Sequence, residues 1–314
     1  MNYKQLDERK KAQIDILLRC GYSMRAAGKK LNISHTTISR YKREVYKKRE
    51  IDVKVKYKEF LAYLHKHYDW KCRGVEVCVQ QFNRYHPRKA CVSYQQVYNW
   101  MNEEKIDIKT QDTCYKRRKR KGKKKKEGMM AHLKWSLANK TVLPIRLRPK
   151  CLEKREEIGH LEIDLIIGKK NEYPAIISIV DRCTRVVNLV KAESRYSYHI
   201  DKKILDYIRE KEIVAKSITV DNGLEFQSLG KVGKKLGIKI YKCDPYCSFQ
   251  RGTNEKLNGI VRRFIPKGKS LYTVEQQYLE DISFKINSMP RKMFDFETPF
   301  AIEYNQLSSG AVEI

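Results

Sequence analysis

The spacing of apolar and polar residues predicts three short helices within residues 1–50. Apolar side chains recur at helical intervals along DERKKAQIDILLRC, and Gly21 ends this segment. Ser23 can cap a second helix, and Ser34 can cap a third after a short turn. Two short helices joined by a tight turn are typical of a helix-turn-helix, in which the second helix enters the major groove of DNA.

The third predicted helix, HTTISRYKREVYKK, carries hydroxyl groups near its start and basic side chains after them. Such groups suit contacts with base edges and phosphates. A small helical bundle with merely solvated charges is the alternative, but the small residues Ala26 and Ala27 permit close helix packing and favour the DNA-binding interpretation. The residues expected to contact DNA are Thr36, Thr37, Ser39, Arg40, Lys42 and Arg43.

Residues 51–112 are predicted to form a second helical module. The segment 56–70 is amphipathic, and the segment 93–105 places a packing face after a capping serine. This module is expected to bind DNA or to mediate dimerisation. Residues 113–150 follow as a basic linker, because the run KRRKRKGKKKKEG is too charged to bury apolar surface. The run can add DNA affinity through counterion release, and a nuclear localisation signal is its competing interpretation.

Short β-rich segments replace the helical pattern from residue 158 onward. HLEIDLIIG, YPAIISIVD and RVVNLVK predict three strands of an antiparallel meander. A helix, the strand KSITVD, a helix, the strand IKIYK and a helix at 250–264 follow. This order predicts an α/β domain at residues 151–314, with a mixed five-stranded sheet flanked by helices. The chain is therefore expected to be multidomain, with an all-α N-terminal region before an α/β core.

Basic residues are concentrated in the first half of the chain. The 314 residues carry a formal net charge of +30. Residues 1–150 hold 40 basic and 14 acidic residues, against 27 and 23 in residues 151–314. This asymmetry indicates that the N-terminal half binds a polyanion. DNA or RNA is favoured over an anionic membrane, because no amphipathic helix with an apolar anchoring face stands out.

Neither a membrane span nor a secretory signal is expected. The chain has no apolar run of about 18 residues, and its start, MNYKQLDERKK, lacks an apolar core. A cytoplasmic, nucleoid-associated protein is therefore expected. The nine cysteines are scattered without a CxxC pair, so we expect free thiols, mostly buried, rather than disulfides or a structural zinc site.

Three acidic residues are candidates for a metal centre. Asp164 lies within the first predicted strand, Asp221 ends the fourth strand, and Glu255 lies on the last predicted helix. If the first and fourth strands are neighbours, the two aspartates lie side by side, and Glu255 can complete the cluster. Three carboxylates without cations would repel one another. Their natural use is to hold two Mg²⁺ or Mn²⁺ ions for an in-line phosphoryl displacement.

Arg262 follows Glu255 by seven residues, or two helical turns, and so shares its helix face. Its guanidinium group is expected to bind a DNA phosphate beside the metal centre. Other side chains compete for metal-binding or supporting roles, but they rank below the three acids because none has the same three-way spacing. These competitors are Glu162, Glu225, Asp181, Asp244 and His160.

Four sequence blocks resemble the bacterial insertion-sequence transposases with an RNase H-like integrase core, in particular the IS-thirty family. The blocks are IGHLEIDLIIG, VDNGLEF, CDPYCSFQRGTNEKLNGIVRRFIPKG and INSMPRK…ETPF, and they occur in the family's order. The resemblance extends from the helix-turn-helix to about residue 305. The spacing of 33 residues between Asp221 and Glu255 fits the family's aspartate–aspartate–glutamate pattern. The resemblance implies that these two residues and Asp164 form the catalytic, metal-binding triad.

The resemblance also implies a Mg²⁺-dependent enzyme that moves a mobile DNA element. Such a transposase would bind the terminal inverted repeats, cleave the element's ends and join them to target DNA. Because two ends must be cut together, a homodimer or a larger assembly is expected. A retroviral-type integrase and a catalytically inactive, transposase-derived DNA-binding repressor are the alternatives.

The sequence departs from the family's usual pattern at three places. Leu161 stands where the family usually has Trp, and Ile163 stands where it usually has Gly. In the last block, Phe294–Asp295 replaces the usual Leu-Gly. None of these departures removes a predicted metal ligand.

Overall fold

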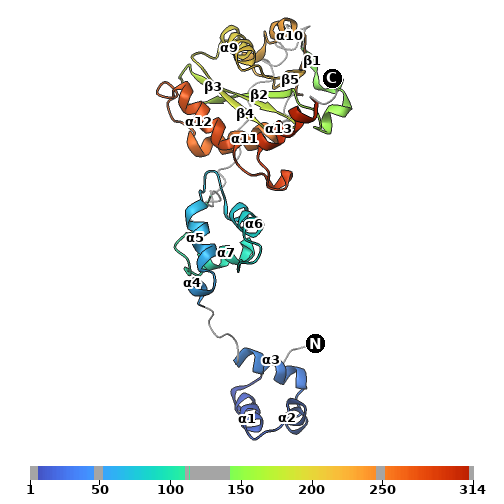
Figure 1. Ribbon diagram of the computed structural model, residues 1–314, viewed down its shortest axis with the longest axis vertical. Coiled ribbons are helices and arrows are strands. Elements are labelled where there is room, and N and C mark those ends of the chain that lie inside the picture. Colours follow the sequence, from blue (N-terminus) through green and yellow to red (C-terminus); the bar gives the residue numbers. More distant parts are fainter. Residues whose placement is uncertain (1–5, 46–51, 110–112, 114–141, 245–251, 311–314) are drawn as a thin grey trace. The chain divides into compact units, whose positions relative to one another are not determined.

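The computed structural model describes residues 6–45, 52–109, 113, 142–244 and 252–310, with only the backbone at 43–45, 252–253, 255 and 309–310. The chain divides into two compact units, Met1–Lys58 and Glu59–Ile314 (Figure 1). The predicted domain boundaries at residues 50 and 112 and the basic run at 116–128 lie outside the described residues. No described helix is long and apolar enough to cross a membrane.

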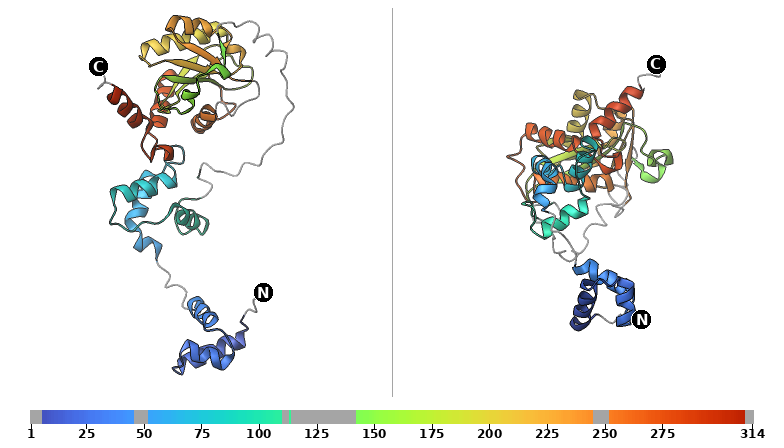
Figure 2. Two further views of the ribbon diagram at one scale, coloured as in Figure 1. Left: turned by 90° about the vertical axis from the view of Figure 1, so that its right-hand side faces the viewer. Right: turned by 60° about the horizontal axis from the view of Figure 1, so that its bottom comes forward.

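The N-terminal unit contains the three predicted helices. Asp7 caps the first of them, and the Ser23 side chain accepts a hydrogen bond from the Ala26 backbone N–H at 3.2 Å, which confirms the predicted cap of the second helix. Ile14 and Ile38 are fully buried between the helices, which form one compact group in both views of Figure 2. The helices are α1 (Glu8–Arg19), α2 (Met24–Leu31) and α3 (His35–Val45).

Gly28 allows α2 and the turn after it to approach each other closely. A Cβ atom at this position would lie only 2.6 Å from the backbone oxygen of Ile33. Replacing Gly28 with alanine is therefore expected to destabilise the N-terminal unit by about 1–3 kcal/mol through overpacking, although alanine is intrinsically the better helix former. Urea unfolding followed by circular dichroism measures the change.

The control is Lys29→Ala at the neighbouring exposed position of α2, which also introduces an alanine into this helix but creates no close contact. Equal stability of the two variants would contradict the steric role of Gly28.

A helical module lies at the start of the second unit. The predicted helices at 56–70 and 93–105 correspond to α5 (Lys58–His67) and α7 (Tyr94–Asn102). Two further helices were not predicted: α6 (Val75–Tyr85) within this module, and α4 (Val53–Lys56) at the end of the first unit. Helix α6 does carry the signal of an amphipathic helix, because its buried residues are Val75, Cys78, Val79 and Phe82.

The core sheet has six strands in the order β1-β6-β5-β2-β3-β4. The predicted meander is confirmed, because β2, β3 and β4 pair antiparallel, whereas β2, β5, β6 and β1 pair in parallel. The predicted number of five strands was wrong by one short edge strand, β1, which is too short for its sequence to show a pattern. The strands are β1 (Leu143–Pro144), β2 (His160–Ile167), β3 (Ala175–Asp181), β4 (Val187–Ala192), β5 (Ser217–Val220) and β6 (Lys239–Lys242).

Helices cover both faces of this sheet, as expected for an α/β RNase H-like core (Figure 1). Apolar residues of α9 (Ser197–Glu210) and α10 (Gly230–Leu236) fill one face together with Leu161 and Ile163. Those of α11 (Gly252–Phe264) and α12 (Gln276–Asn287) fill the other. The remaining elements are α13 (Pro299–Gly310) and the 3₁₀ turns η2 (Ile145–Leu147), η3 (Lys150–Glu153), η4 (Leu224–Phe226) and η6 (Lys292–Phe294).

Helix α12 also satisfies the backbone of the edge strand β4. The Asn287 side chain accepts from the Val187 N–H and donates to its carbonyl, both at 2.9 Å. Ser283 accepts from the next outward-facing N–H, that of Leu189, at 3.1 Å. These contacts occupy backbone groups that an exposed edge strand would offer to another chain. They also fix the position of the helical layer against the sheet.

Candidate functional site

The strands that carry Asp164 and Asp221 are neighbours in the sheet. β2 and β5 pair in parallel, with Glu162 opposite Thr219. Continuing this register by two residues sets Asp164 level with Asp221, which directly follows β5. Because side chains alternate along a strand, Asp164 shares a sheet face with Glu162, the face that α11 covers.

Groups on β2 and α11 hold the carboxylate of Asp164. Its Oδ1 accepts a hydrogen bond from the Leu165 N–H at 2.9 Å, and its Oδ2 accepts one from Asn258 Nδ2 at 2.6 Å. The Oδ1 of Asn258 in turn lies 3.4 Å from the hydroxyl of Ser178, which is opposite Asp164 on β3. Asn258 on α11 therefore links this helix to β2 and β3 at the acidic residue.

Asp221 is held by the turn that it begins. Its Oδ1 accepts a hydrogen bond from the Gly223 N–H at 2.8 Å. A Cβ atom on Gly223 would lie 2.9 Å from this oxygen and 2.6 Å from Glu225 Oε2. The two carboxylates therefore converge on the one residue of the turn that has no side chain. Asn222 anchors the turn by donating to the Cys243 carbonyl at 2.5 Å.

The third predicted acid, Glu255, lies in the first turn of α11, and its side chain is outside the described part of the structure. Asn258 and Arg262 follow it by three and seven residues, so the three positions share one face of the helix. Asn258 contacts Asp164, and Arg262 donates to the Ile167 carbonyl at the end of β2 at 2.6 Å. Burial lowers the pKa of the Arg262 guanidinium.

The bond between Asn258 and Asp164 was not predicted from the sequence, although the spacing of three residues from Glu255 was visible. Replacing Asn258 with alanine is expected to weaken binding of a divalent cation by about 10–100-fold, because Oδ2 of Asp164 loses the amide that orients it. Calorimetric titration with Mn²⁺ measures the change. The control, Gln227→Ala, removes an exposed amide that contacts Ser197 and should leave the affinity unchanged.

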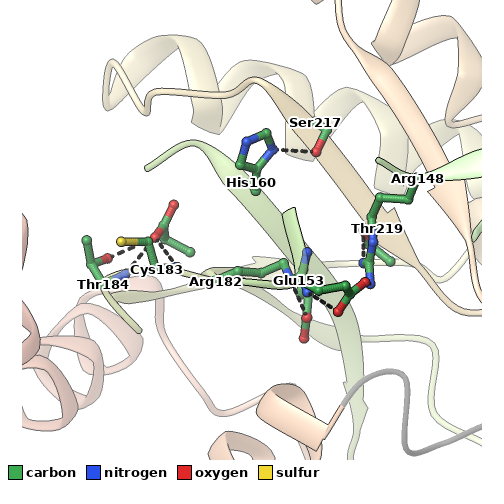
Figure 3. Close-up of polar contacts among 10 residues, drawn as sticks. Arg148, Glu153, His160, Arg182, Cys183, Thr184, Ser217 and Thr219 are labelled. Atoms are coloured by element: carbon green, nitrogen blue, oxygen red, sulfur yellow. Dashed lines mark hydrogen bonds and ion pairs between the residues drawn. The ribbon is translucent and has the colours of Figure 1, made fainter. Parts of the chain in front are cut away.

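A buried ion network surrounds Glu162, which shares a sheet face with Asp164, and Figure 3 shows its members Arg148, Glu153 and Arg182. Arg182 Nε lies 3.0 Å from Glu162 Oε1, and both side chains are excluded from solvent. Glu153 bridges two cations, since Arg182 donates to it at 3.2 Å and Arg148 also donates to it. Arg148 further donates to the hydroxyl of Thr219 on β5 at 3.1 Å. The segment before β2 is thereby joined to the two strands that lead to the aspartates.

The pKa values of two groups in this network are shifted from their ordinary values. Burial lowers the pKa of Arg182, and the nearby charge of Arg148 lowers it further, whereas Glu162 and Glu153 oppose both effects. Burial raises the pKa of Glu153, but hydrogen bonds and charges from the two arginines outweigh it and leave this pKa lowered. The carboxylates therefore balance cations that would otherwise be costly to bury.

The competing candidates have structural partners. Asp181 accepts hydrogen bonds from the N–H groups of Gly159, Cys183 and Thr184, each at 2.8 Å, and so holds the turn between β3 and β4. His160 Nδ1 lies 2.8 Å from the hydroxyl of Ser217 on β5, a contact visible in Figure 3. Glu162 is paired with Arg182, and Glu225 is the competitor that converges with Asp221.

The predicted DNA contacts lie on α3. Thr36 and Arg40 are exposed, and Thr37, Ser39 and Lys42 are half-buried, whereas the side chain of Arg43 is not described. The opposite face of the helix packs into the unit through Ile38 and Tyr41. The Tyr41 hydroxyl donates to Asp15 at 2.8 Å, and this bond is the main cause of its raised pKa. The packing leaves the polar positions on the outer side of α3.

The donor chemistry at the sheet edge fits a hard divalent cation. Aspartate oxygens are the preferred ligands of Mg²⁺ and Mn²⁺, and each carboxylate oxygen can coordinate a cation while it accepts a hydrogen bond. Among the side chains that the structure describes, no group of three or more His, Cys, Asp or Glu residues suits a metal ion. Glu255, the predicted third ligand, is outside that set.

The two departures from the family pattern on β2 lie away from the acids. Leu161 and Ile163 are 2% and 0% exposed and pack in the core beneath α9 and α10. This is the sheet face opposite Asp164. A leucine and an isoleucine at these positions therefore add to the apolar core and leave the carboxylate face unchanged.

Comparison with known proteins shows relatives among insertion-sequence transposases. The chain is 35% identical over 215 residues to the transposase for insertion sequence element IS4351 of Bacteroides fragilis. The aligned region covers 67% of this chain and 63% of that protein. It is 34% identical over 157 residues to transposase InsI for insertion sequence element IS30A of Escherichia coli K12. That aligned region covers 50% of this chain and 40% of that protein. The chain thus spans less than two-thirds of these relatives' length. No protein-family model matches it.

Solved structures of retroviral proteins are also similar. The catalytic core domain of BIV integrase aligns with 49% of this chain and 97% of its own, at a TM-score of 0.37 and 18% identity. A chain of the simian T-cell lymphotropic virus intasome, solved in complex with the PP2A regulatory subunit B56 gamma, covers 46% of this chain and 53% of its own, at a TM-score of 0.39 and 19% identity.

Proposed function

Because this chain is homologous to the IS30-family insertion-sequence transposases over half to two-thirds of its length, we propose that it is the transposase of a mobile DNA element. The chain would bind the terminal inverted repeats of the element, cleave its ends and join them to target DNA. The observation that supports this most is the pairing of β2 with β5, which sets Asp164 level with Asp221.

The catalytic residues in this proposal are Asp164, Asp221 and Glu255, which would hold two Mg²⁺ or Mn²⁺ ions. When bound, such a pair of ions activates the attacking oxygen and stabilises the leaving oxygen of an in-line displacement. Asn258 orients the carboxylate of Asp164, and the turn at Gly223 orients that of Asp221. No nucleophilic side chain is required, because water and then a DNA 3′-hydroxyl group attack the phosphorus.

The N-terminal unit would select the DNA. The side chains predicted for this role are on the outer side of α3, where a recognition helix meets the major groove. Phosphate contacts of the basic first half would supply much of the affinity. A dimer or a larger assembly would carry out the reaction, because both ends of the element must be cut together.

Arg262 has both a structural contact and a DNA-binding role in this proposal. Its Nη2 donates to the Ile167 carbonyl, so it fixes α11 to the end of β2. A guanidinium group has five donors, and one backbone contact leaves others for a phosphate. We therefore retain Arg262 as a DNA-binding residue that also has a structural contact.

A cleavage assay tests the proposal. Full-length protein is incubated with a labelled duplex from the end of the element, in the presence of Mg²⁺, of Mn²⁺ or of EDTA. We expect strand cleavage and joining only with the metal. Binding of the duplex without cleavage under both metals would instead favour the DNA-binding repressor.

Sequence flanking the gene offers an independent check. Imperfect inverted repeats close to both ends of the reading frame are expected if the chain is encoded by the element that it moves. Long terminal repeats of a provirus would favour the retroviral-type integrase instead.

A further inference from the structure

A cavity of about 270 Å³ opens beside the N-terminal half of α11. Four cations line it, which are Arg155, Arg185, Lys256 and Arg291, and no carboxylate is among the lining residues that the structure describes. They come from the segment before β2, the turn between β3 and β4, α11 and the loop after α12. Segments distant in the chain thus place like charges around one space.

Gathering these cations has an electrostatic cost. Burial lowers the pKa of Arg185 to about 10, and the charge of Arg155 adds to this effect, whereas Glu162 and Asp181 act in the opposite direction. Burial also lowers the pKa of Arg291, whose Nε is buried without a hydrogen-bond partner among the described residues. An anion in the cavity would offset the repulsion and supply acceptors.

The remainder of the wall is apolar. Leu257 and Ile260 of α11 and Met293 of η6 contribute it, and Met293 is 61% exposed. A ligand that fits both parts of the wall has an anionic group attached to an apolar or aromatic body. A nucleotide unit of DNA has this chemistry, since its phosphate can meet the cations while its sugar or base lies on the apolar surface.

We propose that this cavity binds one nucleotide unit of a DNA strand, with the phosphate held by the four cations. The proposal rests on the proposed function, because it takes DNA as the polyanion that the core meets. The phosphate contact in this cavity is distinct from the one proposed for Arg262. Lys256 and Ile260 are four residues apart and share one flank of α11, whereas Asn258 and Arg262 lie on the flank that contacts β2.

The position of the cavity suits it to hold a DNA strand close to the predicted catalytic acids. Lys256 directly follows Glu255, so the cavity begins one residue from the third predicted acid. A strand anchored there would be restrained on one side of α11 while its scissile phosphate lies on the other. Restraint of this kind lowers the entropy cost of aligning the phosphorus with the attacking oxygen.

The first test measures the salt dependence of DNA binding. Full-length protein with Arg155→Gln and Lys256→Gln is titrated with a fluorescein-labelled duplex from the element's end at several salt concentrations. Loss of one phosphate contact should flatten the slope of log affinity against log salt by about 0.9. The control variant, Lys234→Gln with Lys235→Gln, removes two exposed charges from α10 on the opposite sheet face and should keep the wild-type slope. Equal slopes for the two double variants would overturn the proposal.

The second test is independent of both catalysis and charge. Met293 is replaced by the photo-crosslinking residue p-benzoylphenylalanine, and Lys235 is replaced in the same way as a control. Irradiation should crosslink the labelled duplex at position 293 and not at 235. If the protein crosslinks DNA at position 293 but shows no cleavage, the binding site is supported and the proposed function is contradicted. Metal-dependent cleavage without crosslinking at 293 would overturn the binding site alone.

Discussion

Replacing Asp221 with asparagine is expected to abolish metal-dependent cleavage while leaving DNA binding intact. The amide keeps the shape of the side chain, and its oxygen can still accept the bond from the Gly223 N–H, so the turn should survive. In the proposed mechanism, the lost negative charge weakens the binding of the cations that stabilise charge in the transition state. We expect the free energy of activation for cleavage to rise by several kcal/mol, which lowers the rate roughly 10³-fold or more.

Cleavage of a labelled end duplex and equilibrium binding of the same duplex measure the two properties separately. Glu225→Gln is the matched control, because this carboxylate also converges on Gly223 but is not a member of the predicted triad. It should retain far more activity than the Asp221 variant. Cleavage by Asp221→Asn within tenfold of the wild-type rate would show that this aspartate is not an essential metal ligand.

Replacing Arg182 with methionine is expected to destabilise the core by about 3–5 kcal/mol, because it leaves a buried carboxylate without its cation. Glu162 is fully excluded from solvent, and Arg182 Nε is 3.0 Å from its Oε1. The partner that would remain for Glu153 is Arg148. The midpoint of urea unfolding, at a constant slope against urea concentration, measures the loss.

Two further variants separate burial from charge. The double variant Glu162→Met with Arg182→Met removes both charges and should recover most of the stability, because apolar residues of similar volume often replace a buried ion pair without loss. Lys216→Met breaks the exposed pair with Glu157 and should cost no more than about 1 kcal/mol. A similarly small effect of Arg182→Met alone would contradict an essential buried pair.

Much of the local structure could be predicted because it depends on neighbours in the chain. The Ser23 cap, the meander of β2, β3 and β4, and the helix–strand order after it follow from short-range patterns. Helix α6 was missed although its apolar spacing was present. Strand β1 could not be predicted, because two residues carry no periodicity and their partners on β6 lie far along the chain.

The candidate site was only partly visible in the sequence. The order of the blocks singled out Asp164, Asp221 and Glu255, but their proximity depended on an assumption that β2 and β5 are neighbours. The structure provides that pairing. It also reveals that Asn258 holds Asp164, a contact between residues 94 positions apart. No local pattern reports such a distance.

The sequence alone therefore determined which residue types are available: the acids in family order, the basic first half and the polar positions of α3. The tertiary structure decided which of them meet. It turned Glu162 into the partner of Arg182, joined Arg148 to Thr219, and gathered Arg155, Arg185, Lys256 and Arg291 around one cavity. The physical reason is that sheet register and helix packing are set by burial summed over the whole core, whereas a side chain's charge or hydrogen-bonding capacity belongs to the residue itself.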